Sequence, residues 1–215
     1  MGHRNAGWSH ERSLFDRGFR AVAGVDEVGR GCLAGPVVAG AVILDPARPV
    51  RRVRDSKLVP PAERARLARR IAARSRAFAV GVVDAEIIDR TDILRATFAA
   101  MRRAVAGMWV APDFVLVDAL EIPGLDVPQQ GIVRGDRCSV SIAAASIIAK
   151  FYRDEMMRSF HRLYPAYGFN LNSGYGTPDH LEALRRFGAT PLHRITFHGV
   201  REDAQLPLLL GERSH

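Results

Sequence analysis

The stretch VAGVDEVGRGCLAGPVVAGAVIL, residues 22–44, decides the fold of this chain. It begins with a short apolar run that ends at two adjacent acids, Asp26 and Glu27. Residues 36–44, PVVAGAVIL, are β-branched and apolar, and proline is tolerated at the first position of a strand. The stretch therefore predicts two strands, residues 20–26 and 36–44, joined by a glycine-rich turn.

The turn carries Gly29, Arg30 and Gly31, which invite comparison with a dinucleotide-binding loop. The spacing is not that of the GxGxxG pattern, and the residues that follow predict a strand where a nucleotide loop needs a helix. An ordinary turn with solvated acids is the simplest alternative. A dinucleotide site is excluded, and the choice between a plain turn and a different kind of site depends on the rest of the chain.

Further elements follow from hydrophobic periodicity and capping residues. We expect strands at residues 77–83, 114–118 and 129–134, and helices at 60–75, 139–163 and within TPDHLEALRRFG, with one or two more in 84–108. Ser139 suits the N-cap of the long helix, whose small apolar residues should pack closely on the sheet. The order predicts an α/β fold, a mixed five-stranded sheet flanked by helices, with a C-terminal helical extension.

The length of 215 residues fits one domain with a small appendage. We expect an N-terminal tail, loosely held or with a short helix, a catalytic domain, and a C-terminal helical extension and tail, at residues 1–19, 20–165 and 166–215.

Lys and Arg outnumber Asp and Glu by 31 to 23, and the sequence pI is near 10.4. Such a basic balance favours nucleic acid as a partner, although membranes and acidic proteins also attract basic chains.

Cysteine usage and apolar runs narrow the class of protein further. Cys32 and Cys138 form no CxxC pair, so a zinc site of that kind is not supported. The N-terminus has no apolar core of the signal-peptide type, and the longest apolar stretch is too short to span a bilayer. We therefore expect a soluble, cytoplasmic monomer that does not associate with a membrane.

Three predicted strand ends carry an acid, and open α/β sheets bind ligands at the carboxyl ends of their strands. Four carboxylates in one small space repel one another unless divalent cations neutralise them. Hard oxygen ligands suit Mg²⁺ or Mn²⁺, and two such ions can activate water for phosphodiester hydrolysis. An acid cluster on a basic protein predicts a nuclease, and its carboxylates are Asp26, Glu27, Asp118 and Asp136.

The segment DEVGRG, residues 26–31, resembles the signature of the bacterial ribonuclease HII family, the type 2 ribonucleases H. Other segments resemble motifs of that family in the same order, over about residues 20–200. They are Asp55-Ser56-Lys57, FVLV followed by Asp118, GDRCSVSIAAASIIAKFYRD at 135–154, Gly174-Tyr175-Gly176-Thr177 and PLHRITF at 191–197.

The resemblance implies an RNase H-like fold and hydrolysis of RNA in RNA/DNA hybrids. It also implies cutting at ribonucleotides embedded in duplex DNA, with 3′-hydroxyl and 5′-phosphate ends, for ribonucleotide removal and primer RNA degradation. The alternatives are a non-catalytic hybrid-binding module on the same fold and a related nuclease that acts on DNA alone. A homologue that has lost its catalytic activity should lack at least one of these carboxylates, whereas this chain keeps all four.

The same resemblance assigns roles to individual residues. The four acids would bind two Mg²⁺ or Mn²⁺ ions, and the Gly-Arg-Gly turn would contact the sugar-phosphate and sense the 2′-hydroxyl. Tyr175 would stack on the following sugar. Lys57 follows Asp55 in a loop, and its position alone leaves open a phosphate contact or a solvated turn. Two departures stand out: Ser173 replaces the family's Lys, and Ala119-Leu120 follow the central aspartate where the family has Gly-Asn. The substrate-binding set is Gly29, Arg30, Gly31, Lys57 and Tyr175.

Several other groups have simpler interpretations. Lys150 and Arg153 are expected to pair with Asp154 on a helix surface, and His193 and His198 to have structural or phosphate-binding roles. The arginines of residues 51–70 predict a basic belt that is solvated or holds DNA nonspecifically. The tail segment Gln205-Leu206-Pro207-Leu208-Leu209 resembles peptides that bind bacterial sliding clamps, and an apolar tail packed on the body is the alternative.

Overall fold

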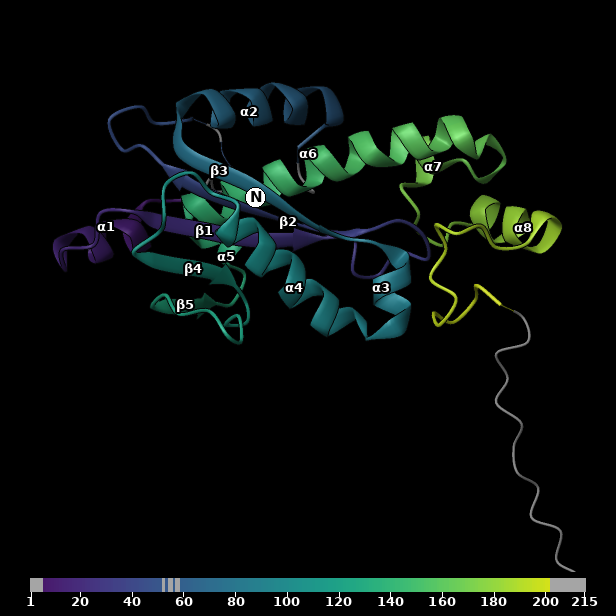
Figure 1. The fold of residues 1–215 in the computed structure, drawn as a ribbon. Coiled ribbons are helices and arrows are strands. Elements are labelled where there is room, and N and C mark those ends of the chain that lie inside the picture. The colour runs from purple at the N-terminus through teal and green to yellow at the C-terminus, as the bar shows by residue number, and fades with distance from the viewer. Residues whose placement is uncertain (1–5, 52, 54–55, 57–58, 202–215) are drawn as a thin grey trace, which may run out of the picture.

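The computed structural model describes residues 6–51, 53, 56 and 59–201 of the chain. Its centre is a five-stranded sheet with the strand order β3-β2-β1-β4-β5 (Figure 1). The mixed sheet predicted from the sequence is confirmed. The strands are β1 Val22–Val28, β2 Val37–Leu44, β3 Ser75–Val83, β4 Phe114–Asp118 and β5 Gln129–Ile132.

The strand directions decide which residues meet at the edge of the sheet. β1 runs antiparallel to β2, which runs antiparallel to β3. β1 runs parallel to β4, with Val25 beside Val117, and β4 runs parallel to β5. The carboxyl ends of β1 and β4 therefore lie side by side, which is where the sequence places Asp26 and Asp118.

Helices cover both faces of the sheet (Figure 1). On one face, apolar residues of α4 pack against β3, β2 and β1; on the other, α6 and α2 form a second core with β2. The predicted region 84–108 forms two helices, with the Asp84 and Asp92 side chains accepting N–H hydrogen bonds at their N-caps. The helices on the two faces and beside the sheet are α2 Pro61–Arg74, α3 Ala85–Arg90, α4 Ile93–Ala106 and α6 Val140–Leu163.

The long helix α6 lies unusually close to the sheet, as its small residues predict. A Cβ atom on Gly24 of β1 would lie 2.0 Å from the carbonyl carbon of Ser141. A Cβ atom on Gly40 of β2 would lie 2.5 Å from the carbonyl oxygen of Ala145. Ser139 accepts the N–H of Ile142 as the N-cap of α6, at 3.2 Å. The start of α6 is thereby fixed beside the end of β1.

A short helix, α1 Ser9–Asp16, packs on this region from the N-terminal side. Leu14 is buried in a small cluster with β1 and β4 residues. The buried Glu11 carboxylate accepts the Ser139 hydroxyl at 2.5 Å and the Ser141 N–H at 3.0 Å. Of the two possibilities left by the sequence, residues 9–16 adopt the short helix.

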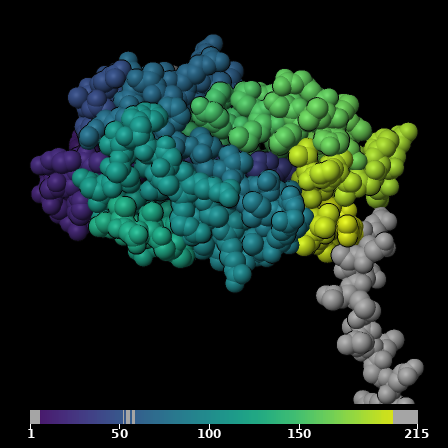
Figure 2. All heavy atoms as spheres, in the orientation of Figure 1, coloured from purple at the N-terminus to yellow at the C-terminus, as the bar shows by residue number. Residues whose placement is uncertain are grey.

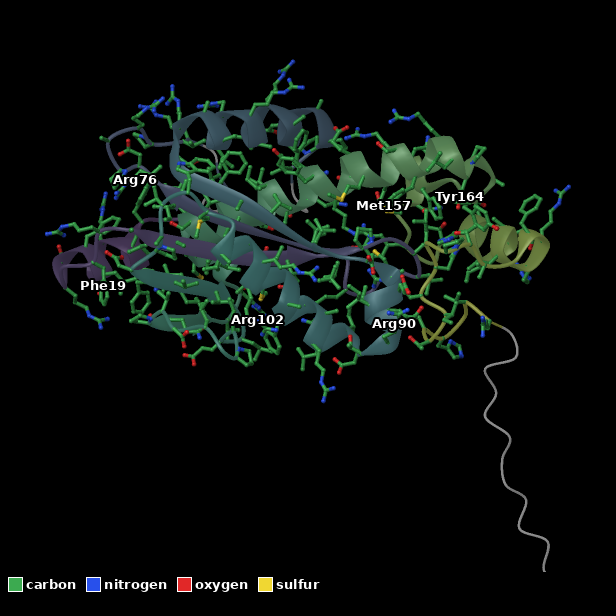
Figure 3. The ribbon with its side chains drawn as sticks, viewed as in Figure 1. Phe19, Arg76, Arg90, Arg102, Met157 and Tyr164 are labelled. Carbon is green, nitrogen blue, oxygen red and sulfur yellow. The ribbon has the colours of Figure 1, made fainter. Side chains whose placement is uncertain are left out.

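Residues 164–201, which follow α6, form a small C-terminal cap beside the far end of that helix (Figure 2). Tyr167 and Phe169 stack with ring centroids 5.6 Å apart and pack with Met157. Met157 belongs to α6 and is labelled in Figure 3. None of the helices in the described ranges is long and apolar enough to cross a membrane. The short elements are α5 Gly135–Cys138, η2 Pro165–Tyr167, α7 Phe169–Asn172 and α8 Pro178–Phe187.

Candidate active site

Asp26 lies in the last part of β1, where alternate side chains face opposite sides of the sheet. Its carboxylate shares the α6 face with Gly24, accepts the Glu27 N–H at 2.7 Å and contacts Ser146. Burial raises the pKa of Asp26 well above its usual range, and the neighbouring charges of Glu27 and Asp118 raise it further. The site therefore concentrates negative charge that nothing in the strand itself neutralises.

Glu27 continues the strand, because β1 runs to Val28 and not only to residue 26 as the sequence predicted. The pleat directs Glu27 away from Asp26, toward the opposite face. Its carboxylate lies 3.4 Å from the guanidinium of Arg30. Burial raises the pKa of Glu27, Arg30 partly offsets this effect, and Asp118 adds to it. Glu27 and Asp118 are thus close enough to interact although they lie on different strands.

Asp118 ends β4 and is fixed by the backbone that follows β5. Its Oδ1 accepts the N–H of Gly135 at 2.6 Å. Arg134, just before, has a left-handed backbone with φ 56°, which turns the chain into α5. Asp136 is the next residue after Gly135 and lies in the first turn of α5. The Gly135 contact therefore brings the segment with Asp136 to the end of β4.

Asp26, Glu27 and Asp118 interact at one edge of the sheet, but the acids are not arranged as a finished metal site. Within the ranges that the structure describes, no group of three or more His, Cys, Asp or Glu side chains could hold a metal ion. The Glu27 carboxylate is turned to Arg30, and the Asp118 carboxylate accepts a main-chain N–H. The residues nevertheless fit divalent cations: all four are hard oxygen donors, and two have pKa values raised by burial and by neighbouring acids.

The Gly29-Arg30-Gly31 turn begins directly after the acids. Gly29 has φ 94°, and a Cβ atom there would lie 2.2 Å from Nε of Arg153. Only glycine satisfies both the backbone and the space at this position. The Arg30 side chain is 46% exposed, so the turn offers a cation and open main chain to a ligand.

Tyr175 lies beside residues 32–34, which follow this turn. The carbonyl of Gly174 accepts the N–H groups of Leu33, at 2.8 Å, and Ala34, at 3.3 Å. The Tyr175 hydroxyl shares a hydrogen bond with Cys32, and burial, followed by the charge of Cys32, raises the pKa of Tyr175. The residue remains 42% exposed. The glycine-rich turn and Tyr175 therefore form one continuous surface.

Two interpretations from the sequence need revision or completion. Lys150 pairs with Asp154 at 2.6 Å as expected, but Arg153 does not pair on the helix surface: it is fully buried and binds carbonyl groups. Arg64, grouped with the solvated belt, is also buried and pairs with Asp154 at 2.7 Å. Lys57, the remaining predicted substrate residue, lies outside the described residues.

Sequence reasoning also missed functional neighbours in the C-terminal part. Arg194 is fully buried beneath the glycine-rich turn, and His180 joins His193 beside Tyr175. Arg153 follows the apolar, small-residue stretch of α6, which is a signal of burial. Nothing local distinguishes Arg194 or His180 from surface residues.

A mixed five-stranded sheet with acids at the adjoining ends of β1 and β4, and helices on both faces, defines an RNase H-like nuclease. The family model for ribonuclease HII matches residues 23–200. The chain belongs to the ribonuclease HII family, and it is a ribonuclease H, an endonuclease that hydrolyses phosphodiester bonds. The family is dependent on divalent metal ions.

Individual relatives agree with this assignment. Ribonuclease HII of Solibacter usitatus (strain Ellin6076) is 50% identical over 198 residues, covering 92% of this chain and 86% of that protein. The crystal structure of ribonuclease H2 from Pyrococcus horikoshii OT3 superposes with a TM-score of 0.72 and 25% identity, covering 85% of this chain and 96% of that one. The RNase HII of Archaeoglobus fulgidus, solved as a complex with PCNA, gives 0.66 and 27%, covering 83% and 95%.

Proposed function

We propose that this chain cuts RNA/DNA hybrids and duplex DNA that contains embedded ribonucleotides, leaving 3′-hydroxyl and 5′-phosphate ends. The observation that carries this proposal is the direct continuity of the acids with the glycine-rich turn. Asp26 and Glu27 lie at the end of β1, and the turn follows directly. The main chain after the turn is hydrogen-bonded to the Tyr175 segment. The carboxylates that take part in hydrolysis and the turn that recognises the sugar would therefore be separated by only a few residues.

The acids have a defined part in this reaction. Asp26, Glu27, Asp118 and Asp136 would hold two divalent ions, Mg²⁺ or Mn²⁺. Bound ions would supply Lewis-acid activation of the attacking water and stabilise charge on the leaving oxygen. Glu27 would have to leave Arg30 to join the other carboxylates, which frees the Arg30 guanidinium for a phosphate.

The glycine-rich turn and Tyr175 would select the nucleotide at the cut. Gly29 and Gly31 let the main chain approach a sugar closely, and main-chain groups can hydrogen-bond a 2′-hydroxyl that DNA lacks. The exposed Tyr175 ring would stack on the sugar of the next nucleotide and favour a deoxyribose there. Ser173 stands where the family often has Lys, so a phosphate contact would come from elsewhere on this basic chain.

A three-substrate assay tests this proposal. Duplex DNA with one ribonucleotide, a continuous RNA/DNA hybrid and an all-DNA duplex are each incubated with Mg²⁺, Mn²⁺ or EDTA. We expect cleavage of the first two only, only with metal, and with the 5′-phosphate on the downstream product. Equal cutting of the all-DNA duplex would contradict the proposed choice of substrate, and no cutting with metal would support a binding module.

We also propose that the tail binds a sliding clamp through Gln205-Leu206-Pro207-Leu208-Leu209. These residues lie outside the described part of the chain, so the support is the sequence pattern together with the complex that the Archaeoglobus fulgidus RNase HII forms with PCNA. The test is binding of the full chain to a bacterial clamp, with Leu206→Ala/Leu208→Ala as the variant. Equal affinity of the variant and the parent chain would remove this proposal.

A further inference from the structure

Two arginines, Arg153 of α6 and Arg194 of the C-terminal cap, are fully buried directly behind the glycine-rich turn. Neither forms an ion pair with an acid of residues 6–51, 53, 56 or 59–201, and every hydrogen bond that they donate goes to a main-chain carbonyl. Burial of a guanidinium without a carboxylate is costly, so such a pair needs a compensating role.

Arg153 joins two segments that are far apart in the sequence. Its Nε and Nη2 donate to the carbonyls of Pro36, at 3.0 Å, and Ala34, at 3.2 Å, at the end of the turn. Its Nη1 donates to the carbonyl of Ser173, at 2.9 Å, two residues before Tyr175. Gly29 packs against the same side chain. One guanidinium therefore spans the turn and the Tyr175 segment.

Arg194 holds the other side of the turn. Its Nη1 donates to the carbonyl of Arg30 at 2.8 Å, and its Nε and Nη2 donate to that of Gly35 at 3.1 and 2.8 Å. The Arg194 N–H itself donates to the carbonyl of Leu33 at 2.8 Å. Burial lowers the pKa of Arg194 to about 10, and the nearby Arg153 contributes to this shift.

The acids of the site and the residues that would recognise the nucleotide are thus held in place by different parts of the structure. The acids are fixed by strands β1 and β4 and by local hydrogen bonds, such as that from Gly135 to Asp118. The recognition surface, which is defined here as residues 29–36 and 173–175, is held by the two guanidinium groups. Their donors are planar and fixed in direction, a geometry that lysine cannot reproduce.

We propose that Arg153 and Arg194 are positioning residues that fix the recognition surface and determine the choice of ribose over deoxyribose, without acting on the hydrolytic step. This inference rests on the proposed function of the same site. Their positive charge also lies behind the place where a substrate phosphate would bind, so it would attract the nucleic-acid backbone.

The test compares Arg153→Lys and Arg194→Lys in the full chain, since each keeps the charge and loses the planar set of donors. Arg102→Lys is the matched control, because Arg102 also donates to a main-chain carbonyl, that of Pro123 at 2.9 Å, but projects from α4 (Figure 3). Thermal melts first establish that each variant is folded. The kcat and KM are then measured on duplex DNA with one ribonucleotide, and the Kd on this duplex and on all-DNA duplex.

We expect both variants to raise KM about tenfold or more and to reduce the ratio of the two Kd values by a similar factor, with kcat within about threefold of the parent. The Arg102→Lys control should match the parent chain. A fall in kcat alone, with KM and the Kd ratio unchanged, would overturn the inference. If the parent chain does not cut the ribonucleotide-containing duplex, the proposed function fails first, and the two failures are distinguishable.

Hydrogen exchange on the parent chain gives a second reading if a variant does not fold. The amides of Leu33 and Ala34 donate to Gly174 within the surface that the arginines hold. We expect these amides to exchange as slowly as those in β1, because the segment opens only with the domain. Exchange as fast as in the exposed residues Gly124 and Asp126 would overturn the inference without any substitution.

Discussion

The Nε2 atoms of His180 and His193 lie 3.0 Å apart in a hydrogen bond between two buried rings. The Thr190 N–H donates to Nδ1 of His193 at 2.9 Å, so the proton of the His193 ring is on Nε2. His193 therefore donates to His180, whose Nδ1 donates to the carbonyl of Tyr175 at 2.8 Å. Two neutral rings connect residue 190 to the carbonyl of Tyr175, and neither can accept a proton without breaking a contact.

This hydrogen-bonded pair of neutral histidine rings predicts that mild acid destabilises the protein. Burial and the adjacent His180 lower the pKa of His193 to about 4. The unfolded chain takes up this proton near pH 6.5 and the folded chain only near pH 4, so the stabilisation is complete above pH 6.5 and is lost as the pH falls. We expect the free energy of unfolding to fall by on the order of 2–3 kcal/mol between pH 7 and pH 4, measured with urea.

The His193→Gln variant separates this effect from the titration of other groups. It should be less stable than the parent at pH 7, and its stability should change less between pH 7 and pH 4 because the titrating ring is absent. A variant with the same pH dependence as the parent would mean that the His180–His193 pair does not cause the acid sensitivity.

The Asp26→Asn substitution should remove activity and, without metal, stabilise the fold. The pKa of Asp26 is raised by burial and by Glu27, so its charged form costs free energy in the folded state. Asn keeps an oxygen for the Glu27 N–H and carries no charge. We expect a gain of about 1 kcal/mol in EDTA at pH 7.5.

The sign of this gain can be checked with pH. A carboxyl group with a raised folded pKa contributes its stability at low pH and loses it as the pH rises through that pKa. The advantage of Asp26→Asn over the parent should therefore shrink toward pH 4. A constant difference at all pH values would show that packing, and not charge, explains the gain.

The close approach of α6 to the sheet predicts a steep cost for a single methyl group. In Gly24→Ala, the new Cβ would lie 2.0 Å from the main chain at Ser141, which cannot move without moving α6. We expect a loss of about 3 kcal/mol or more in the free energy of unfolding. Gly7→Ala is the matched control, since no heavy atom lies within 4 Å of its Cβ position and its cost should be below about 1 kcal/mol.

Much of the fold could be predicted from local sequence. The apolar run before Asp26, the Ser139 cap and the small residues of α6 each act over a few positions, and each has the predicted structure. The sequence could not show that β1 continues to Val28, because pairing with β2 extends the strand through polar residues. Tertiary pairing determined that boundary.

The site could be predicted where acidic residues lie at the ends of strands. It could not be predicted where segments distant in the sequence hold the site in place. Asp26 and Asp118 meet because parallel strands align their carboxyl ends. Arg194 is buried through contacts with the carbonyls of Gly35 and Arg30, more than a hundred residues away, which no local pattern encodes. The domain boundaries, the site roles, the cytoplasmic location and the monomeric state stay predictions.

Catalysis by carboxylate-held metal ions is tested most directly by single-turnover cleavage of duplex DNA with one ribonucleotide, comparing the parent chain with Asp118→Asn. Mg²⁺ binding is followed by calorimetry on the same samples. Asn keeps an oxygen that can accept the Gly135 N–H, so the fold should be preserved. We predict a rate lower by about a thousandfold or more, together with weakened Mg²⁺ binding. A folded Asp118→Asn chain that cuts at the parent rate would contradict metal catalysis at this edge of the sheet.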